Sequence, residues 1–300
     1  MNLFLILPIL SGFFDARQRR VIKRSTTDRL VLVSVGLLFS LPFFAVWLFL
    51  KGMPVIQPNF AIILFSQIVL LSVAFVLTVE AHRNSDFTIA GSYLSLTPAF
   101  LLFTSWLLIG KIPAIWQFVG IPMLTVGLYV LNFKEEADRF KEKGRRLRFF
   151  DPFKYIFVDK GSRLMFIVSL IFSVTANFNY LGLESSSIPF FLLTSYAGVS
   201  MLCALAAVYK KKFTADIMSR RPFSLIVLYG VYFAVAEPLA FLGIAFLKDV
   251  PLAIALKRTG LNVSLFSIGV SSGERQNLRW RLSGMLLMLL GMAIALGAIV

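Results

Sequence analysis

The sequence predicts an all-α integral membrane protein with ten transmembrane helices. Two features of the composition support this prediction: hydrophobic residues make up 58% of the 300 residues, and charged residues make up only 15%. A soluble chain has roughly 45–50% apolar and about 25% charged residues, so a soluble fold of this composition would leave large apolar patches exposed. The third feature is spacing, because apolar stretches of about 20 residues, the length of a membrane helix, recur along the whole chain.

Ten apolar segments account for these stretches. They cover roughly residues 1–16, 30–50, 58–80, 86–109, 113–133, 163–183, 187–209, 222–247, 250–271 and 280–300. The breaks at Lys111–Pro113 and Lys248–Pro251 are short, which predicts that the helices on either side form antiparallel hairpins. The sequence does not show the alternation of apolar and polar residues over about ten residues that is typical of β-barrel strands.

The first segment is short, which raises a cleaved signal peptide as an alternative. A signal peptide carries its positive charge before the apolar stretch. Here only Met1 and Asn2 precede that stretch, and five basic residues follow it within residues 17–24. We therefore expect a retained helix whose N-terminus lies outside the cell.

Basic residues are unevenly distributed between the loops. Of the 30 Lys and Arg residues, 25 fall in or beside alternate loops on one side of the membrane, and three (Lys51, Lys111 and Lys248) fall on the other. The positive-inside rule then places both termini outside, in a multi-pass protein of a plasma membrane such as the bacterial inner membrane. The net charge of +15 is thus interpreted as a topology signal that also attracts anionic headgroups to the basic loops, and no nucleic-acid partner is expected.

Three glycines near the end of each half of the chain have similar spacings. They are Gly110, Gly120 and Gly127 in the first half, and Gly273, Gly284 and Gly291 in the second. Because each half holds five spans, the second half enters the membrane from the opposite side, as in inverted-repeat transporters. The predicted division is a first repeat at 1–133, a basic cytoplasmic linker at 134–162 that lies partly in the headgroup region, and a second repeat at 163–300. Glycines that only allow close helix packing are the alternative explanation.

The same motifs resemble those of EamA-type transporters in the drug/metabolite transporter superfamily. The first copy is Leu107–Pro113 with Gln117, Gly120 and Gly127, and the second is Gly273–Arg275 with Gly284–Leu287 and Gly291. The family motif has Glu after the first glycine, which Glu274 keeps and Lys111 replaces. The resemblance implies two five-helix inverted repeats around a central cavity, a small-molecule substrate, and neither an ATPase nor a cofactor.

Two adjacent cations, Lys257 and Arg258, lie inside the ninth segment, about 10 Å deep at 1.5 Å per residue. A charge within the membrane costs at least about 2.5 kcal/mol, so we expect both side chains to face a cavity. The arginine fork and the lysine point charge suit a phosphate or carboxylate. Glu237, followed by Pro238, lies at a similar depth and either balances the cations or carries a coupling proton. In the structural alternative, a Glu237–Arg258 pair only locks two helices together while Lys257 reaches outward.

The Lys257–Arg258 pair also resembles the Lys-Arg pair with which plastidic phosphate translocators of the same superfamily bind the substrate phosphate. The lysine in the fourth helix of that family has no counterpart in Thr88–Gly91. The resemblance therefore implies an anion-binding pair without the complete phosphate site.

Further polar residues within the segments are weaker candidates for substrate contact, since each could equally form a helix–helix hydrogen bond. They are Asn262, Tyr232, Asn177, Tyr93 and Gln67. The sole histidine, His82, is expected at the cytoplasmic interface. No catalytic triad, phosphate-binding loop or metal-ligand spacing occurs in the sequence, so neither an enzyme nor a metal site is predicted.

These observations predict a secondary transporter that moves a small anionic or zwitterionic metabolite by alternating access. Three alternatives are kept: a proton-coupled exporter of amino acids or amphipathic cations, a lipid-intermediate flippase, and a non-transporting membrane scaffold. A scaffold predicts that Glu237, Lys257 and Arg258 neutralise one another without a cavity. A homodimer is compatible with the sequence.

Overall fold

The computed structural model describes residues 3–84, 93–112, 114–142, 160–213, 220–271 and 278–295. The first half contains α1 (Ile6–Arg24), α2 (Arg29–Leu38), α3 (Leu41–Lys51), α4 (Phe60–Asn84), α6 (Thr97–Ile109) and α7 (Ile115–Glu142), with short 3-10 turns at Leu3–Leu5 and Leu94–Leu96. The second half contains α9 (Lys160–Glu184), α10 (Ile188–Tyr209), α11 (Arg220–Leu247), α12 (Val250–Ser271) and α13 (Leu278–Ala295). No strand occurs in the described ranges, which confirms the predicted all-α class.

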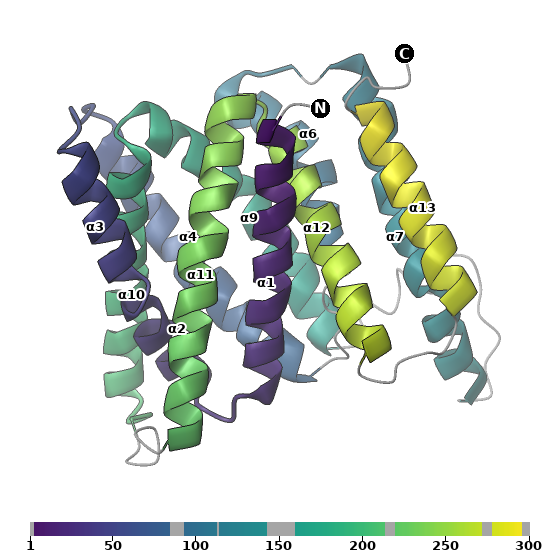
Figure 1. Cartoon of the computed structure of the whole chain (residues 1–300), viewed down its shortest axis with the longest axis horizontal. Helices are drawn as coiled ribbons and strands as arrows, with labels where there is room; N and C mark the ends of the chain where they lie inside the picture. Colours follow the sequence, from purple (N-terminus) through teal and green to yellow (C-terminus); the bar gives the residue numbers. More distant parts are fainter. Residues whose placement is uncertain are drawn as a thin grey trace.

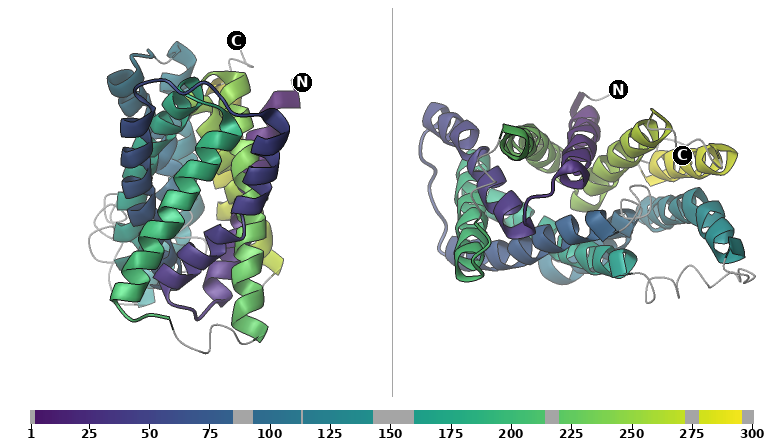
Figure 2. Two further views of the ribbon diagram at one scale, coloured as in Figure 1. Left: turned by 90° about the vertical axis from the view of Figure 1, so that its left-hand side faces the viewer. Right: turned by 90° about the horizontal axis from the view of Figure 1, so that it is seen from below.

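The helices correspond to the ten predicted segments and form two rows. In the view along the bundle, α11, α1, α12 and α13 follow one another in one row, and α10, α4, α9, α6 and α7 in the other (Figure 2). By length and composition alone, five described segments could each cross a membrane: α2 with α3, α4, α9, α10 and most of α11. Helix α1 begins and α13 ends at the same end of the bundle, as expected for an even number of crossings (Figure 1).

Two segments differ from the prediction. The second segment is divided between α2 and α3 because Pro42, which has no backbone N–H, stands in the first turn of α3. The first helix does not end near residue 16 but continues to Arg24. The reason is that Lys, Arg and Gln are good helix formers and that Asp15 and Arg19 form an i,i+4 ion pair of 3.0 Å. The basic residues expected in the first loop therefore belong to a helix.

The predicted linker is partly helical. Helix α7 continues through residues 134–142 and ends at Glu142. The linker from residue 143 to residue 159 is outside the described residues, and the prediction that part of it lies in the headgroup region falls there.

Helices α7 and α13 are packed along each other through the glycines of the predicted repeat. A Cβ added to Gly120 would lie 2.4 Å from the carbonyl oxygen of Gly291, and one added to Gly127 would lie 2.8 Å from that of Gly284. The later glycine of each helix thus faces the earlier glycine of the other, so the helices are antiparallel. If the two halves are exchanged, so that Gly120 takes the place of Gly284 and Gly127 that of Gly291, each of the two contacts becomes the other. Two helices related by a two-fold axis show this pattern. The close packing of the glycines is therefore found, and its exchange symmetry is what the predicted inverted repeat requires.

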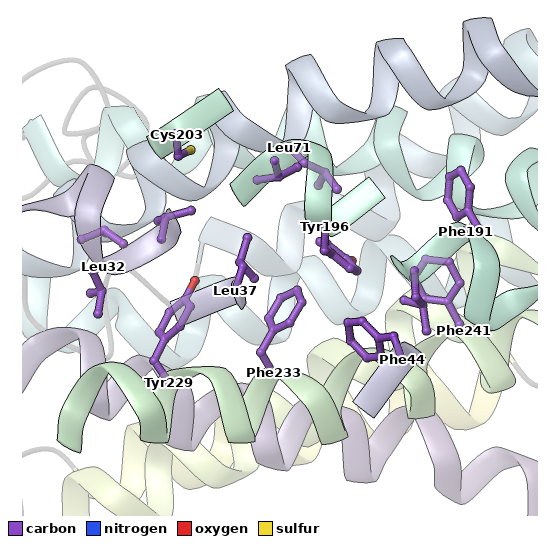
Figure 3. Packing of buried hydrophobic residues seen from close by; sticks show 14 of the residues in the cluster. Leu32, Leu37, Phe44, Leu71, Phe191, Tyr196, Cys203, Tyr229, Phe233 and Phe241 are labelled. Carbon is purple, nitrogen blue, oxygen red and sulfur yellow. The ribbon is translucent and has the colours of Figure 1, made fainter. Parts of the chain in front are cut away.

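The largest apolar core cluster lies among α2, α4, α10 and α11 (Figure 3). Tyr196 and Phe233 pack edge to face with ring centroids 4.6 Å apart, and Phe75 joins them from α4. These aromatic residues also form part of the wall of a central cavity. The core therefore fixes the helices from which the polar side chains of the cavity project.

The distribution of charge gives a testable orientation. Position 144 lies outside the described residues, in the most basic stretch of the linker. A Gly144→Cys variant in a Cys203→Ala background is expected to react with a membrane-impermeant thiol reagent only after permeabilisation, because basic loops stay in the cytoplasm. Labelling of intact cells from outside would reverse the orientation.

Candidate functional site

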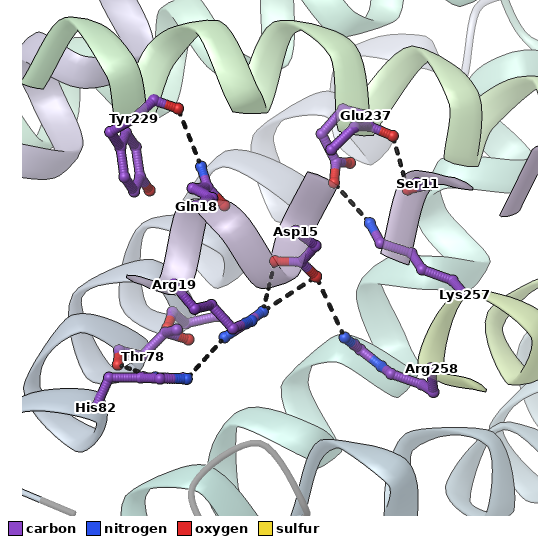
Figure 4. A network of polar contacts seen from close by, with 12 residues as sticks. Ser11, Asp15, Gln18, Arg19, Thr78, His82, Tyr229, Glu237, Lys257 and Arg258 are labelled. Carbon is purple, nitrogen blue, oxygen red and sulfur yellow. Dashed lines mark hydrogen bonds and ion pairs between the residues drawn. The ribbon is translucent and has the colours of Figure 1, made fainter. Parts of the chain in front are cut away.

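A central cavity of about 70 Å³ lies between the two halves of the chain. Helices α1, α4 and α6 line it from the first half, and α9, α10, α11 and α12 from the second. The volume has room for several water molecules or one small ligand group. Five charged side chains reach it, and Figure 4 shows how they meet around α1. They are Asp15, Arg19, Glu237, Lys257 and Arg258.

The close approach of α1 and α12 brings these charges together. A Cβ added to Gly12 would lie 2.1 Å from the carbonyl oxygen of Lys257, and one added to Gly260 would lie 2.1 Å from that of Ile9. Glycine at both positions lets the two backbones touch. Asp15 follows Gly12 by one helical turn, so its carboxylate faces the cationic pair of α12.

Glu237 on α11 forms the first charge cluster with Lys257. The Lys257 ammonium donates to Glu237 Oε1 at 2.7 Å, and the Tyr196 hydroxyl donates to Oε2 at 2.8 Å. Both side chains of the ion pair are largely buried, with 10% of Lys257 and 14% of Glu237 exposed. Lys257 is thus neutralised inside the bundle, and the alternative pairing of Glu237 with Arg258 is not found.

Asp15 on α1 forms the second cluster, with two arginines. Arg19 Nη2 lies 3.0 Å from Asp15 Oδ1 and donates to Oδ2 at 3.2 Å. Arg258 Nη1 lies 3.8 Å from the same Oδ2, beyond hydrogen-bond distance. Arg258 is buried with its guanidinium 5.4 Å from the centroid of the Phe172 ring. Within the described part of the chain, its Nε has no hydrogen-bond partner.

The charges that line the cavity do not cancel. Two carboxylates face three cations, which leaves the described lining with one surplus positive charge. The surplus positive charge lies in the second cluster. Glu237 neutralises Lys257, whereas Asp15 is the one carboxylate of the described lining near both Arg19 and Arg258. In a site shielded from water, a negatively charged ligand group would be drawn to this cluster.

His82 lies near the end of α4, as predicted, and contacts Arg19. The side chain is fully buried, because α1 extends past Asp15 and covers it. His82 Nδ1 lies 2.9 Å from the carbonyl oxygen of Thr78, and Nε2 lies 3.5 Å from Arg19 Nη1. A neutral imidazole protonated at Nδ1 fits both contacts, since Nε2 can then accept from the arginine.

Three of the eight predicted site residues line the cavity, namely Glu237, Lys257 and Arg258. The other five lie outside its lining. Asn177 accepts a hydrogen bond from Ser105 at 2.7 Å and so joins α9 to α6. Gln67 donates to Asn179 at 2.5 Å and joins α4 to α9.

The remaining predicted residues also pack within the bundle. Tyr232 lies against the largest core cluster, Tyr93 packs against a smaller cluster that includes Ala16, and Asn262 is buried on α12. Sequence reasoning missed Asp15 and Arg19, which were not among the predicted site residues. The available signal was the i,i+4 spacing of Asp15 and Arg19.

Comparison with known proteins finds a matching family model and similar solved structures. The model of the EamA-like transporter family matches residues 2–133, which confirms the resemblance over the first repeat. A solved structure described as "Crystal structure of protein" is 16% identical, with a TM-score of 0.71 over 98% of this chain and 95% of that chain, and so shows a shared fold. No curated protein matches. The matched family consists of transporters, so the match over residues 2–133, together with the apolar helices, supports the prediction of a multi-pass membrane transporter.

Proposed function

Because residues 2–133 match the EamA-like transporter family, we propose that the chain is a secondary transporter of a small anionic metabolite, or of a zwitterion bound through its anionic group. The surplus positive charge of the central cavity carries this proposal. Arg258 is the side chain that binds the anionic group, because it is buried, lines the cavity and lies beyond hydrogen-bond distance of its carboxylate partner.

The size and position of the cavity support a small substrate and alternating access. Pockets for drug-sized ligands measure roughly 300–1,000 Å³, whereas this cavity measures about 70 Å³. Its walls come from both halves of the chain. A relative movement of the two halves would widen the cavity toward one face of the membrane and then toward the other.

The alternatives fit the site less well. A scaffold requires no cavity, and its buried charges should neutralise one another. Lys257 and Arg258 instead line a cavity whose charged side chains leave one surplus positive charge. An exporter of amphipathic cations would bring its substrate to a site that already holds more cations than carboxylates. A lipid flippase requires a cavity large enough for a lipid headgroup and open toward the bilayer, and about 70 Å³ is small for that purpose.

Ligand-induced thermal stabilisation of the purified protein tests the proposal. The panel contains phosphorylated metabolites, carboxylates, amino acids and cations at one ionic strength. Anions are expected to raise the melting temperature of the wild type. Their affinity should fall about 10- to 100-fold in Arg258→Ala, because a hydrogen bond to a charged group contributes roughly 1.5–3 kcal/mol.

Arg258→Lys keeps the charge but loses the guanidinium fork, so its affinity is expected to lie between those of the wild type and Arg258→Ala. Lys257→Ala should weaken anion binding less than Arg258→Ala, because Glu237 already neutralises Lys257. Stabilisation by cations alone, or unchanged anion binding in the Arg258 variants, would refute an anionic substrate and favour the cation exporter.

A further inference from the structure

The two arginines of the cavity share Asp15 unequally (Figure 4). Asp15 and Arg19 are one turn apart on α1, and both carboxylate oxygens lie within 3.2 Å of Arg19 Nη2. Arg258 approaches from α12 and stays 3.8 Å away. One carboxylate cannot neutralise two guanidinium groups, so Asp15 belongs mainly to Arg19.

Arg258 therefore keeps hydrogen-bonding capacity for a ligand. It is 5% exposed, and among the described residues its Nε has no hydrogen-bond partner. Buried donors of this kind are costly unless a partner fills the position. Lys257 keeps donors as well, but its charge is already compensated, because its ammonium donates to the Glu237 carboxylate at 2.7 Å.

Asp15 also places a fixed negative charge beside the position where the ligand would bind. An anion that contacts Arg258 enters the same cavity lining as Asp15, whose Oδ2 lies 3.8 Å from Arg258 Nη1. With Asp15 counted, a ligand with one negative charge makes the described lining neutral, whereas a dianion leaves an uncompensated negative charge next to a carboxylate. Like charges juxtaposed in a binding site oppose binding strongly.

We infer that Asp15 is a specificity-determining residue that restricts the transported ligand to one net negative charge. The inference rests on the proposed anion transport and adds the charge class of the substrate. The Asp15 carboxylate supplies a fixed negative charge on one side of Arg19 and Arg258, and the ligand binds on the other side. The site then selects between ligands by their net charge as well as by the geometry of their hydrogen bonds.

Two probe pairs of similar shape test this inference, methanesulfonate with sulfate and acetate with malonate. Binding to purified protein is measured by thermal stabilisation at constant ionic strength. The wild type is expected to bind the monoanion of each pair more tightly. In Asp15→Asn the ratio of dianion to monoanion affinity should rise at least about tenfold, because a repelling charge is removed. Glu184→Gln removes an equal charge from an exposed side chain at the end of α9 and should leave the ratio unchanged.

Two further variants separate charge from folding. Asp15→Asn with Arg19→Gln removes both partners of the α1 pair, restores the surplus of one positive charge and should regain the preference for monoanions. Arg258→Gln leaves the Asp15–Arg19 pair intact and makes the lining neutral. It should weaken the binding of both anions, that of the dianion by the larger factor, so the dianion-to-monoanion ratio falls below that of the wild type even if Asp15→Asn does not fold. A dianion-to-monoanion ratio in Arg258→Gln above that of the wild type, or a wild-type ratio in folded Asp15→Asn, overturns the inference alone. Absence of any anion effect on the wild type overturns the proposed function and the inference with it.

Discussion

Glu237→Gln is expected to lower the free energy of unfolding by about 3–5 kcal/mol, which is the cost of removing one partner of a buried ion pair. The substitution leaves the Lys257 ammonium without its carboxylate at 2.7 Å, and it removes the charge that accepts the Tyr196 hydroxyl. The surplus charge of the cavity lining would rise at the same time. Thermal or denaturant unfolding of the purified protein measures the effect.

The matched control for this prediction is the double variant Glu237→Gln with Lys257→Met. It removes both charges, so it should recover most of the lost stability. Wild-type stability in the single variant would contradict a counter-charge role. In that case, loss of pH-driven transport by a well-folded Glu237→Gln would indicate a coupling site, and retention of that transport would eliminate the coupling role.

Gly12→Ala is expected to destabilise the protein by roughly 1–3 kcal/mol, although alanine is the better helix former. The added methyl group would lie 2.1 Å from the carbonyl oxygen of Lys257 and 2.5 Å from the backbone nitrogen of Leu261. Neither atom belongs to a flexible side chain, so α1 and α12 must separate. Separation also moves Asp15 away from Arg258, and anion-induced stabilisation should weaken together with the melting temperature.

Ala61→Val serves as the control, because it adds methyl groups at an exposed position of α4 where no packing is disturbed. It is expected to change the melting temperature little. Equal effects of Gly12→Ala and Ala61→Val would contradict the role assigned to the close approach of α1 and α12.

Charge pairing across helices was the part of the site that the sequence predicted poorly. Glu237 was visible as a partner for the cations of α12, but neighbouring residues on a helix point about 100° apart. Whether Lys257 or Arg258 meets Glu237 therefore depends on how α12 is rotated against α11. Asp15 was overlooked because it stands where the first apolar stretch ends, and charged residues at that point are equally compatible with a loop.

The sequence by itself determined the class of protein, the ten segments and the glycines that recur in the two halves. Apolar length and glycine spacing are local properties of the chain, and the cost of exposing backbone polar groups in a bilayer leaves helices as the solution for such segments. Only the tertiary structure decided that α1 carries Asp15 and Arg19 into the cavity and that Arg258 stays 3.8 Å from its carboxylate partner. The reason is that electrostatic pairing depends on distances between helices, and those distances follow from packing, above all from the contact of Gly12 and Gly260 between α1 and α12.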